Sequence, residues 1–386
     1  MCPYPQRFRP QPGSDMPIPE HGAIDEFTAE LIGFYAAAEA SLYRQMARRI
    51  QVGIDDPGWE QRQVGELAAF RRDIDQIVAR LDRTNDTQLP RIISKVSARA
   101  NAITSQEIGA VDRPVTSPAT ASRTAGDFDV ADRDAAATQI RAAVAPVAAR
   151  MAFVASSTYQ NVIGQLLAAD LGSRRRVAQH ALNVFATKGI TGFRDRAGRS
   201  WEMASYVEMA SRTIAANHQI GVQATRLAAA GLDLVIVSNA PQECKLCRPF
   251  EGKILSLSGQ NVGDIEAINP TTGQPVRVRV MTSMARATAA GLHHPNCRHS
   301  ESTYLPGVTQ RPTATADVEG DADRQKLRYL ERQKRAWLRR ASVALTPADA
   351  KKAKDAISRY NGLIGEHVEN TTAKRQRSRE QITAAR

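Results

Sequence analysis

The chain of 386 residues has few aromatic residues and very few cysteines. Aromatic side chains make up 5% of it, although apolar residues make up 42%. That composition favours the packing of thin, alanine-rich helices over the large core of a globular enzyme. Four cysteines are too few for the disulfide framework of a small secreted domain, so we expect a reducing compartment.

The sequence also lacks the patterns of membrane and secretory proteins. It contains no uninterrupted run of about 18 apolar residues, so we expect no membrane span. The N-terminus lacks the charged and apolar regions of a secretory signal. Residues 1–22 instead begin MCPYPQRFRPQPGSDMPIPE, which predicts a disordered, proline-rich arm.

Helical periodicity dominates residues 23–111, and we interpret them as an N-terminal helical assembly region. Apolar residues recur there at spacings of three and four, as in Ile24, Phe27 and Leu31. The stretch Asp55-Asp-Pro-Gly58 predicts a break between two long antiparallel helices. Pro90 predicts a second break before a shorter helix.

Residues 112–130 are rich in proline, serine and threonine, which predicts a linker. Residues 131–188 return to a helical pattern. Their spacing allows a short coiled-coil seam, but a core-facing helix is favoured because Pro146 interrupts the heptads; the stripe comprises Ile140, Val144, Val147, Met151 and Val154. Ser173 is the predicted N-cap of a helix that begins at Arg174.

Residues 189–307 change character and predict a small α+β domain. A hairpin is expected around Asp195–Gly198. The apolar, β-branched run Leu232–Ser238 predicts a buried strand. Lys253–Ser258 and Val276–Val280 alternate like half-exposed strands, and Met284–Ala290 predicts a short helix. The expected fold class is therefore α+β, with a mainly helical N-terminal region, a mixed α/β middle domain and a helical tail.

The middle domain holds three of the four cysteines in a pattern typical of a zinc site. Cys244 and Cys247 form a Cys-x-x-Cys pair directly after the buried strand. About fifty residues later Cys297 supplies a third thiolate, and His294 or His299 can supply the fourth ligand. Two ligands from each side predict a closed, structural Zn²⁺ site rather than an open catalytic one.

Other interpretations of this cluster remain open. Three reduced cysteines beside exposed histidines would bind nothing, and a redox pair would need a thioredoxin-like context that the sequence does not have. An HNH-like nuclease would use His293-His294, but its further histidine is missing, since the next one after His299 is His367. His293 is expected to be a bystander.

The last segment, residues 308–386, is interpreted as a basic helical tail that is partly disordered. From Asp321 to Arg386 it carries 17 Lys and Arg against 8 Asp and Glu. Thr346-Pro347 predicts a helix start, Asn361-Gly362 a break and the last fifteen residues disorder. One interpretation of these charges is a solvated helical face without a ligand. The functional interpretation is weak contact with nucleic acid through five basic residues, Arg332, Lys334, Arg335, Arg339 and Arg340.

Several motifs, in order along the chain, resemble the phage minor capsid protein family of the MuF-like head morphogenesis type. They begin with Gly192-Phe-Arg-Asp-Arg-Ala-Gly-Arg-Ser-Trp201 and continue with Tyr206–Thr213 and Gly231–Ser238. Cys244–Ser256, His294-Pro-Asn-Cys-Arg-His299 and the basic segment Leu330–Arg340 within Gln325–Arg340 follow. The opening helices, including Ala47–Trp59, also fit the N-terminal region of this family. The resemblance extends over most of residues 20–345.

This resemblance implies a structural component of the virion in a tailed phage or prophage. Such a protein would lie inside the head near the portal, after assembly in the host cytoplasm. Its partners would be the portal protein and the major capsid or scaffolding protein, with packaged DNA as a further contact. No membrane partner, small-molecule substrate or enzymatic activity is expected. A degenerate ADP-ribosyltransferase-like domain, with Arg199, Ser200 and Glu208, is the other enzymatic alternative.

Overall fold

The structure is a computed structural model that describes residues 22–111, 130–194, 198, 200–240, 242–310 and 319–382. Most of the predicted proline-rich arm and of the predicted linker lies outside these described residues. The chain divides into two compact units, each assembled from separate stretches. Unit 1 comprises residues 1–23, 95–132 and 216–316, and unit 2 comprises residues 24–94, 133–215 and 317–386. The linear domain boundaries drawn from the sequence stay predictions.

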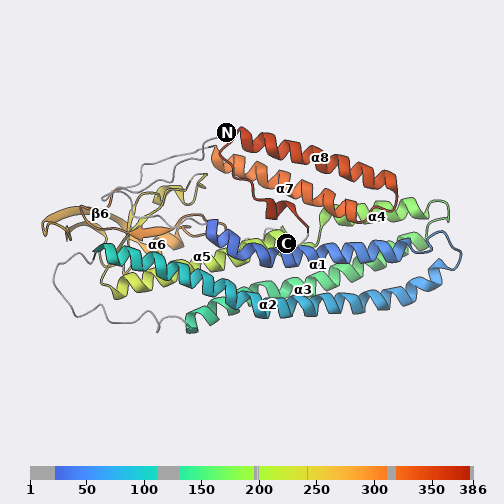
Figure 1. Ribbon diagram of the computed structural model, residues 1–386, viewed down its shortest axis with the longest axis horizontal. Helices are drawn as coiled ribbons and strands as arrows, with labels where there is room; N and C mark the ends of the chain where they lie inside the picture. The colour runs from blue at the N-terminus through green and yellow to red at the C-terminus, as the bar shows by residue number, and fades with distance from the viewer. Residues whose placement is uncertain are drawn as a thin grey trace, which may run out of the picture. The chain divides into compact units, whose positions relative to one another are not determined.

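Helices make up most of the described chain, with one small mixed sheet, so the predicted α+β class is confirmed (Figure 1). The helices are α1 (Gly22–Gln51), α2 (Trp59–Val111), α3 (Val130–Leu167), α4 (Arg174–Lys188), α5 (Met203–Ala229), α6 (Met284–Ala289), α7 (Gly320–Ser342) and α8 (Pro347–Glu369). Two short 3₁₀ helices, η1 (Arg248–Phe250) and η2 (Arg377–Glu380), complete the helical elements.

Two of the predicted helix breaks are wrong. The break after α1 is confirmed, but α2 runs through Pro90 and α8 runs through Gly362. Pro90 removes one backbone hydrogen bond, yet Leu89 and Ile93 beside it are fully buried. Burial of such an apolar stripe stabilises the helix more than the low helix propensity of one residue destabilises it. Helices in proteins therefore tolerate residues of low helix propensity.

Unit 1 contains a five-stranded sheet in the order β5-β6-β4-β3-β7. Its strands are β3 (Leu234–Val237), β4 (Ile254–Ser256), β5 (Gly263–Ile268), β6 (Pro275–Ser283) and β7 (Glu301–Thr303). Strands β4 and β6 are parallel, and the other neighbours are antiparallel. The buried strand predicted from the sequence is β3, whose four residues are all buried.

Three features of the sheet differ from the sequence-based expectation. Strand β4 is buried along its length rather than half-exposed, because it lies between β3 and β6. Strands β5 and β7 were not predicted. The apolar side chains of β3 and β4 face two clusters, one with Leu227, Cys247 and Phe250 and the other with Val278 and Val280. The first of these clusters places the cysteine knuckle against the core of unit 1.

The predicted hairpin near residue 195 is confirmed by the antiparallel pair β1 (Thr191–Arg194) and β2 (Ser200–Glu202). Helix α3 carries the predicted core stripe, since Ile140, Val144 and Met151 are fully buried. By length and composition alone, residues 132–167 of α3 would also suffice to cross a membrane. Length and composition are weak evidence for a membrane span, because the core helix of a soluble protein meets the same criteria.

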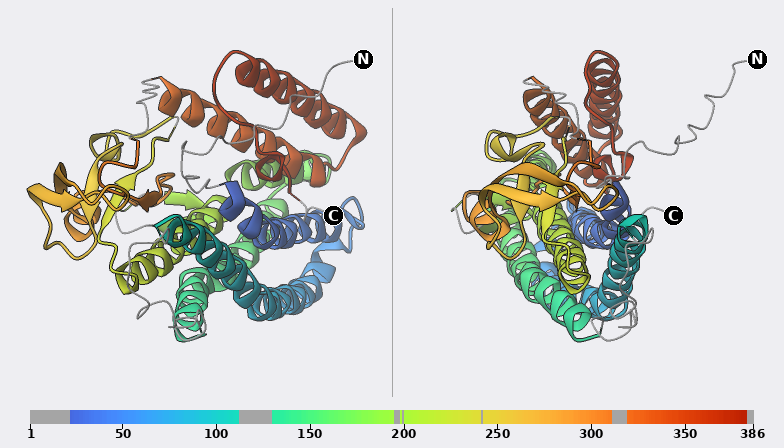
Figure 2. Two further views of the ribbon diagram at one scale, coloured as in Figure 1. Left: turned by 60° about the vertical axis from the view of Figure 1, so that its left-hand side comes forward. Right: turned by 90° about the vertical axis from the view of Figure 1, so that its left-hand side faces the viewer.

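Helices α7 and α8 form an antiparallel pair within unit 2 (Figures 1 and 2). Thr346 caps α8 as predicted, since its Oγ1 accepts a hydrogen bond of 3.1 Å from the backbone N–H of Asp349. Ser173 precedes α4 as predicted, but its hydroxyl donates to Asp170 instead of capping the helix. Leu327 and Leu330 of α7 pack against Ile364 of α8.

Buried ion pairs join α7 to the rest of unit 2. Arg339 is 2% exposed, and its guanidinium contacts Glu202 of β2 directly and lies 3.8 Å from Glu39 of α1. It also donates to the backbone oxygen of Ala186 at 2.8 Å. Arg335 donates to the second oxygen of Glu202 at 3.1 Å. Three helices and a hairpin strand therefore share one charged cluster.

The charges in this cluster depend on each other. Burial would raise the pKa of Glu202, but the guanidinium groups of Arg335 and Arg339 lower it to about 2. Burial raises the pKa of Glu39, which Arg339 only partly offsets. Gly189 has a φ of +69°, and a Cβ there would lie 3.1 Å from Nη2 of Arg339, so a residue with a side chain would be strained and would crowd the guanidinium.

Replacement of Arg339 by methionine should lower the free energy of unfolding by about 3–5 kcal/mol, because it removes the guanidinium beside the buried Glu39 and leaves Glu202 with Arg335 as its remaining arginine partner. Urea denaturation followed by circular dichroism measures the change. The matched control is Arg332→Met on the same helix, where the side chain is exposed and the expected change stays within about 0.5 kcal/mol. Equal stability of the two variants would contradict a stabilising role for the Arg339 contacts.

Candidate metal centre

The first half of the candidate centre is a tight turn after strand β3. The backbone N–H groups of Cys247 and Arg248 both donate to the carbonyl of Cys244, at 3.2 and 3.1 Å. The chain then enters η1, so the two thiols project from one knuckle. Cys247 is fully buried in the core of unit 1, whereas Cys244 is half-buried.

The second half is the loop that follows α6. Gly291 has a φ of +114°, and the non-glycine residues His293 and Asn296 have φ values of +60° and +71°. Such conformations cost on the order of 1–3 kcal/mol each for residues with a side chain. The backbone N–H of Cys297 donates to the carbonyl of His294 at 2.8 Å. This curled loop brings Cys297 back toward the knuckle.

The predicted ligands meet in unit 1 as two overlapping groups. The ligand atoms of Cys244, Cys247 and His294 lie within 4.8 Å of one another, and so do those of Cys247, Cys297 and His299. The Sγ atoms of Cys247 and Cys297 are 3.5 Å apart, and Nε2 of His294 lies 2.9 Å from Sγ of Cys244. Both groups share Cys247, and the structure therefore brings all five predicted residues to one place.

The two histidines are oriented by different partners. Nδ1 of His294 lies 2.7 Å from the carbonyl oxygen of Pro295, which leaves Nε2 facing Cys244. Nε2 of His299 lies 2.6 Å from Oε1 of Glu251, which leaves Nδ1 3.6 Å from Sγ of Cys297. Metal-ligating histidines usually donate their second ring N–H to a carboxylate or a carbonyl, and both histidines have such an acceptor.

The thiols do not ionise alike. A hydrogen bond from Cys247 lowers the pKa of Cys297, and the imidazoles of His293 and His299 lower it further. The same contact with Cys297, together with burial, raises the pKa of Cys247. The surroundings of Cys297 therefore favour its thiolate form, which is the form that binds metal ions.

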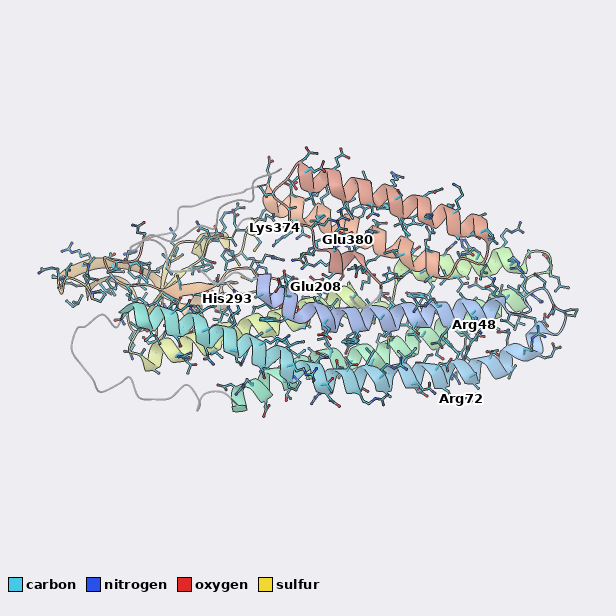
Figure 3. The ribbon with its side chains drawn as sticks, in the orientation of Figure 1. Arg48, Arg72, Glu208, His293, Lys374 and Glu380 are labelled. Atoms are coloured by element: carbon cyan, nitrogen blue, oxygen red, sulfur yellow. The ribbon has the colours of Figure 1, made fainter. Side chains whose placement is uncertain are left out.

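His293 lies closer to the cluster than the sequence suggested. Its Nδ1 is 3.9 Å from Sγ of Cys297, and its Nε2 is 2.5 Å from Oε1 of the buried Glu301 on β7. Glu251 and Glu301 were not singled out in the sequence. Nothing in the spacing of these glutamates identifies them, because the loop geometry and strand β7 place them beside the histidines. Figure 3 labels His293 in this region.

The five basic residues predicted to contact nucleic acid fall into different environments. Arg335 and Arg339 are buried and held by carboxylates, so their charges are not offered at the surface. Lys334 lies 2.7 Å from Glu380. Arg332 is exposed, and the guanidinium of Arg340 lies over the ring of Trp337 at 4.3 Å.

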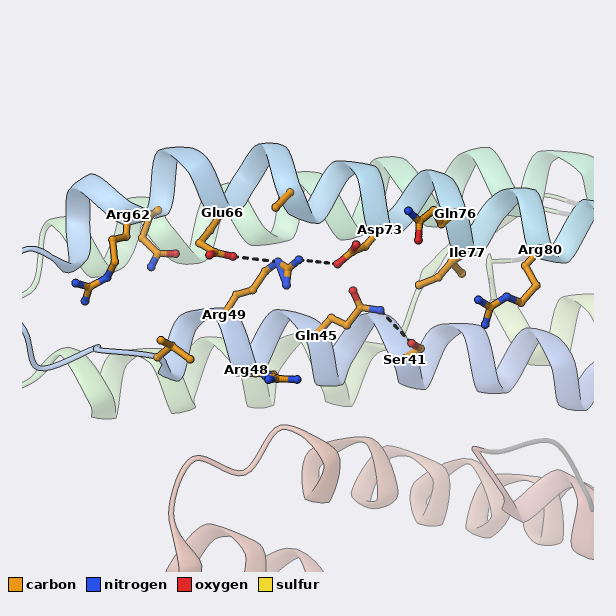
Figure 4. Close-up of a pocket in the computed structure, with 13 residues that line it drawn as sticks. Ser41, Gln45, Arg48, Arg49, Arg62, Glu66, Asp73, Gln76, Ile77 and Arg80 are labelled. Atoms are coloured by element: carbon orange, nitrogen blue, oxygen red, sulfur yellow. Dashed lines mark hydrogen bonds and ion pairs between the residues drawn. The ribbon is translucent and has the colours of Figure 1, made fainter.

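A separate groove of about 530 Å³ runs between α1 and α2 in unit 2 (Figure 4). Arg49 crosses it and pairs with Glu66 at 3.3 Å and Asp73 at 2.6 Å. Its described lining consists of Arg, Gln, Ser and acidic residues with a few apolar ones, and contains no histidine or cysteine. The groove therefore lacks the residue types of the metal centre.

Comparison with known proteins identifies a family for the chain. None of the curated proteins and none of the solved structures matches the chain. The family model described as phage minor capsid protein 2 matches residues 21–369, which include all five candidate ligands. The chain belongs to the phage minor capsid protein 2 family.

Proposed function

We propose that this phage minor capsid protein is a non-enzymatic structural component of the head, and that a zinc ion holds its unit 1 together. The family match over residues 21–369 carries the first part of this proposal. The chain would reside in the virion, inside the head near the portal, after assembly in the host cytoplasm. Its expected partners are the portal protein and the major capsid or scaffolding protein.

The donor set supports zinc as the metal. Three thiols and one imidazole match the Cys₃His sites that bind Zn²⁺ in a tetrahedron. Four protein ligands leave no position for water or substrate, so the ion would be structural. When bound, it would neutralise the thiolates and tie the β3–η1 turn to the loop after α6, with Cys244, Cys247, Cys297 and His299 as its ligands.

His299 is the preferred fourth ligand. It is 2% exposed and its ring is fixed by Glu251, whereas His294 is half-buried and held by a backbone carbonyl. A carboxylate on the far nitrogen raises the basicity of a ligating imidazole. His294 would then lie beside the ion, with its Nε2 near Sγ of Cys244.

The enzymatic alternatives find little support in the site. In an HNH-like nuclease the histidines would face solvent and substrate, but Nε2 of His294 faces Cys244. In an ADP-ribosyltransferase-like site Glu208 would face a nucleotide, but it is half-buried and pairs with Arg212 and Arg379. Arg199 lies outside the described residues. DNA contact in the head remains part of the proposal through exposed cations such as Arg332.

Substitution of Cys297 or Cys247 by serine should abolish stoichiometric zinc and destabilise unit 1. Elemental analysis of the purified chain and hydrogen exchange in residues 234–303 measure the two effects. Cys2→Ser, outside the described residues, is the matched control and should keep one zinc per chain. A zinc-free wild-type chain, or serine variants with unchanged protection, would refute the site.

The choice of histidine is testable with asparagine replacements at each position. His299→Asn should release zinc to a competing chelator far more readily than His294→Asn, because only the first removes a ligand. Glu251→Gln should weaken zinc affinity about 10–100-fold through the orientation of His299. The reverse order of the two asparagine variants would assign the fourth position to His294.

Incorporation into the head tests the assembly role. Heads assembled with Cys297→Ser in place of the wild-type chain should contain much less of this protein, because an unfolded unit 1 cannot dock. Mass spectrometry of purified heads and pull-down with the portal protein measure the loss. Wild-type levels of the variant in heads, with zinc absent, would separate assembly from the metal centre.

A further inference from the structure

The segment after α8, residues 371–382, does not behave as the disordered end that the sequence predicts. It turns back onto unit 2 and forms η2, where Arg379 is 6% and Glu380 2% exposed. Figure 3 labels Glu380 and Lys374 of this segment and Glu208 of α5. A charged chain end that is buried to this degree must be held by specific partners.

Arg379 occupies a seat formed by side chains of α5 and α7. Its Nε donates to Oε1 of Glu208 at 2.5 Å, and Glu208 also accepts from Arg212 at 3.2 Å. From α7, Nη1 of Arg335 donates to the backbone carbonyl of Arg379 at 2.9 Å. Both the side chain and the backbone of residue 379 are therefore recognised.

Two further contacts fix the segment on either side of Arg379. Nε2 of Gln376 donates to Oδ2 of Asp25 on α1 at 2.7 Å. Glu380 accepts from Lys334 of α7 at 2.7 Å and from Arg375 of its own segment at 2.5 Å. The contacts come from three helices that are distant in sequence, so the seat exists only in the folded unit 2.

The seat remains charged over the physiological pH range. Burial would raise the pKa of Glu208, but Arg379 and Arg212 lower it to about 2. If the segment leaves, Glu208 loses its closest partner, Arg379, and retains its contact with Arg212. The loss of this partner favours binding of another arginine-bearing segment.

We propose that the seat at Glu208 is a receptor for the C-terminal segment 371–382, and that the segment of a second copy of this chain can fill it by exchange. A second copy carries the same segment, so its Arg379 is complementary in charge to Glu208 of the first copy. Ala373 is the buried apolar residue of the segment, so charge rather than apolar area holds it. Exchange of such an element between two copies of one chain is domain swapping, a low-cost route to dimers.

Charge reversal in full-length chains tests the exchange. Glu208→Arg alone and Arg379→Glu alone each place like charges at the seat, so amides 377–380 should exchange about tenfold faster or more, and each chain should stay monomeric. In an equimolar mixture, Arg379 of the first variant meets Glu208 of the second, while the two introduced side chains, also of opposite charge, meet at the other seat. Light scattering after gel filtration should then show a dimer.

The double variant Glu208→Arg with Arg379→Glu is the control, since it restores opposite charges within one chain and should recover slow amide exchange. A mixture that stays monomeric while this control recovers would overturn exchange between copies. Wild-type protection in either single variant would overturn the recognition of Arg379 by Glu208.

A peptide of residues 371–382 keeps the proposal testable if Glu208→Arg fails to fold. The acceptor is the full-length Arg379→Glu chain, whose seat is unchanged. Fluorescence anisotropy should show saturable binding of the wild-type peptide, weakened about tenfold or more by Arg379→Glu in the peptide. Absence of binding, or equal binding of both peptides, would overturn the proposal.

Discussion

The cost of burying charge is the constraint on which unit 2 depends. Arg339, Arg335 and Arg379 are each at most 6% exposed, and each has a carboxylate or carbonyl within contact distance. Such groups are stable in the interior only when their partners are present together. Helices α1, α5 and α7, strand β2 and segment 371–382 must therefore assemble as a set, and this cooperativity gives a helical chain with few aromatic residues one defined packing.

In unit 1 the polar groups with restricted access to solvent are thiols and imidazoles, which also need partners there. A small sheet with a short buried strand offers limited apolar area, and the knuckle that carries Cys247 is part of that core. Thiolates in a buried core need a cation or imidazole groups nearby. The loop after α6 supplies the imidazoles, and its backbone adopts positive φ values at His293 and Asn296. The proposed zinc ion would turn that strained arrangement into a cross-link.

The predictions that depended on local pattern largely succeeded. The apolar run around Val235, the cap at Thr346 and the hairpin near residue 195 follow from side-chain period and turn chemistry, which act within a few residues. The breaks predicted at Pro90 and Gly362 failed because distant packing overrides local preference. Strands β5 and β7 were not predicted because β5 mixes Asp and Glu with its apolar residues and β7 consists of three polar residues, Glu301–Thr303. Pairing with β3 and contacts with Glu107 and Gln223 help to bury β7.

The sequence by itself determined the helical class, the buried strand and the set of five candidate ligands, because periodicity and cysteine spacing are local properties. Tertiary structure decided which charged side chains are exposed at the surface. Arg335 and Arg339 look like a basic surface in the sequence, yet they are buried against Glu202. The tertiary structure also brings Glu251 into contact with His299 and Glu208 into contact with Arg379. Each of these contacts joins residues from separate parts of the chain, so no local sequence pattern encodes it.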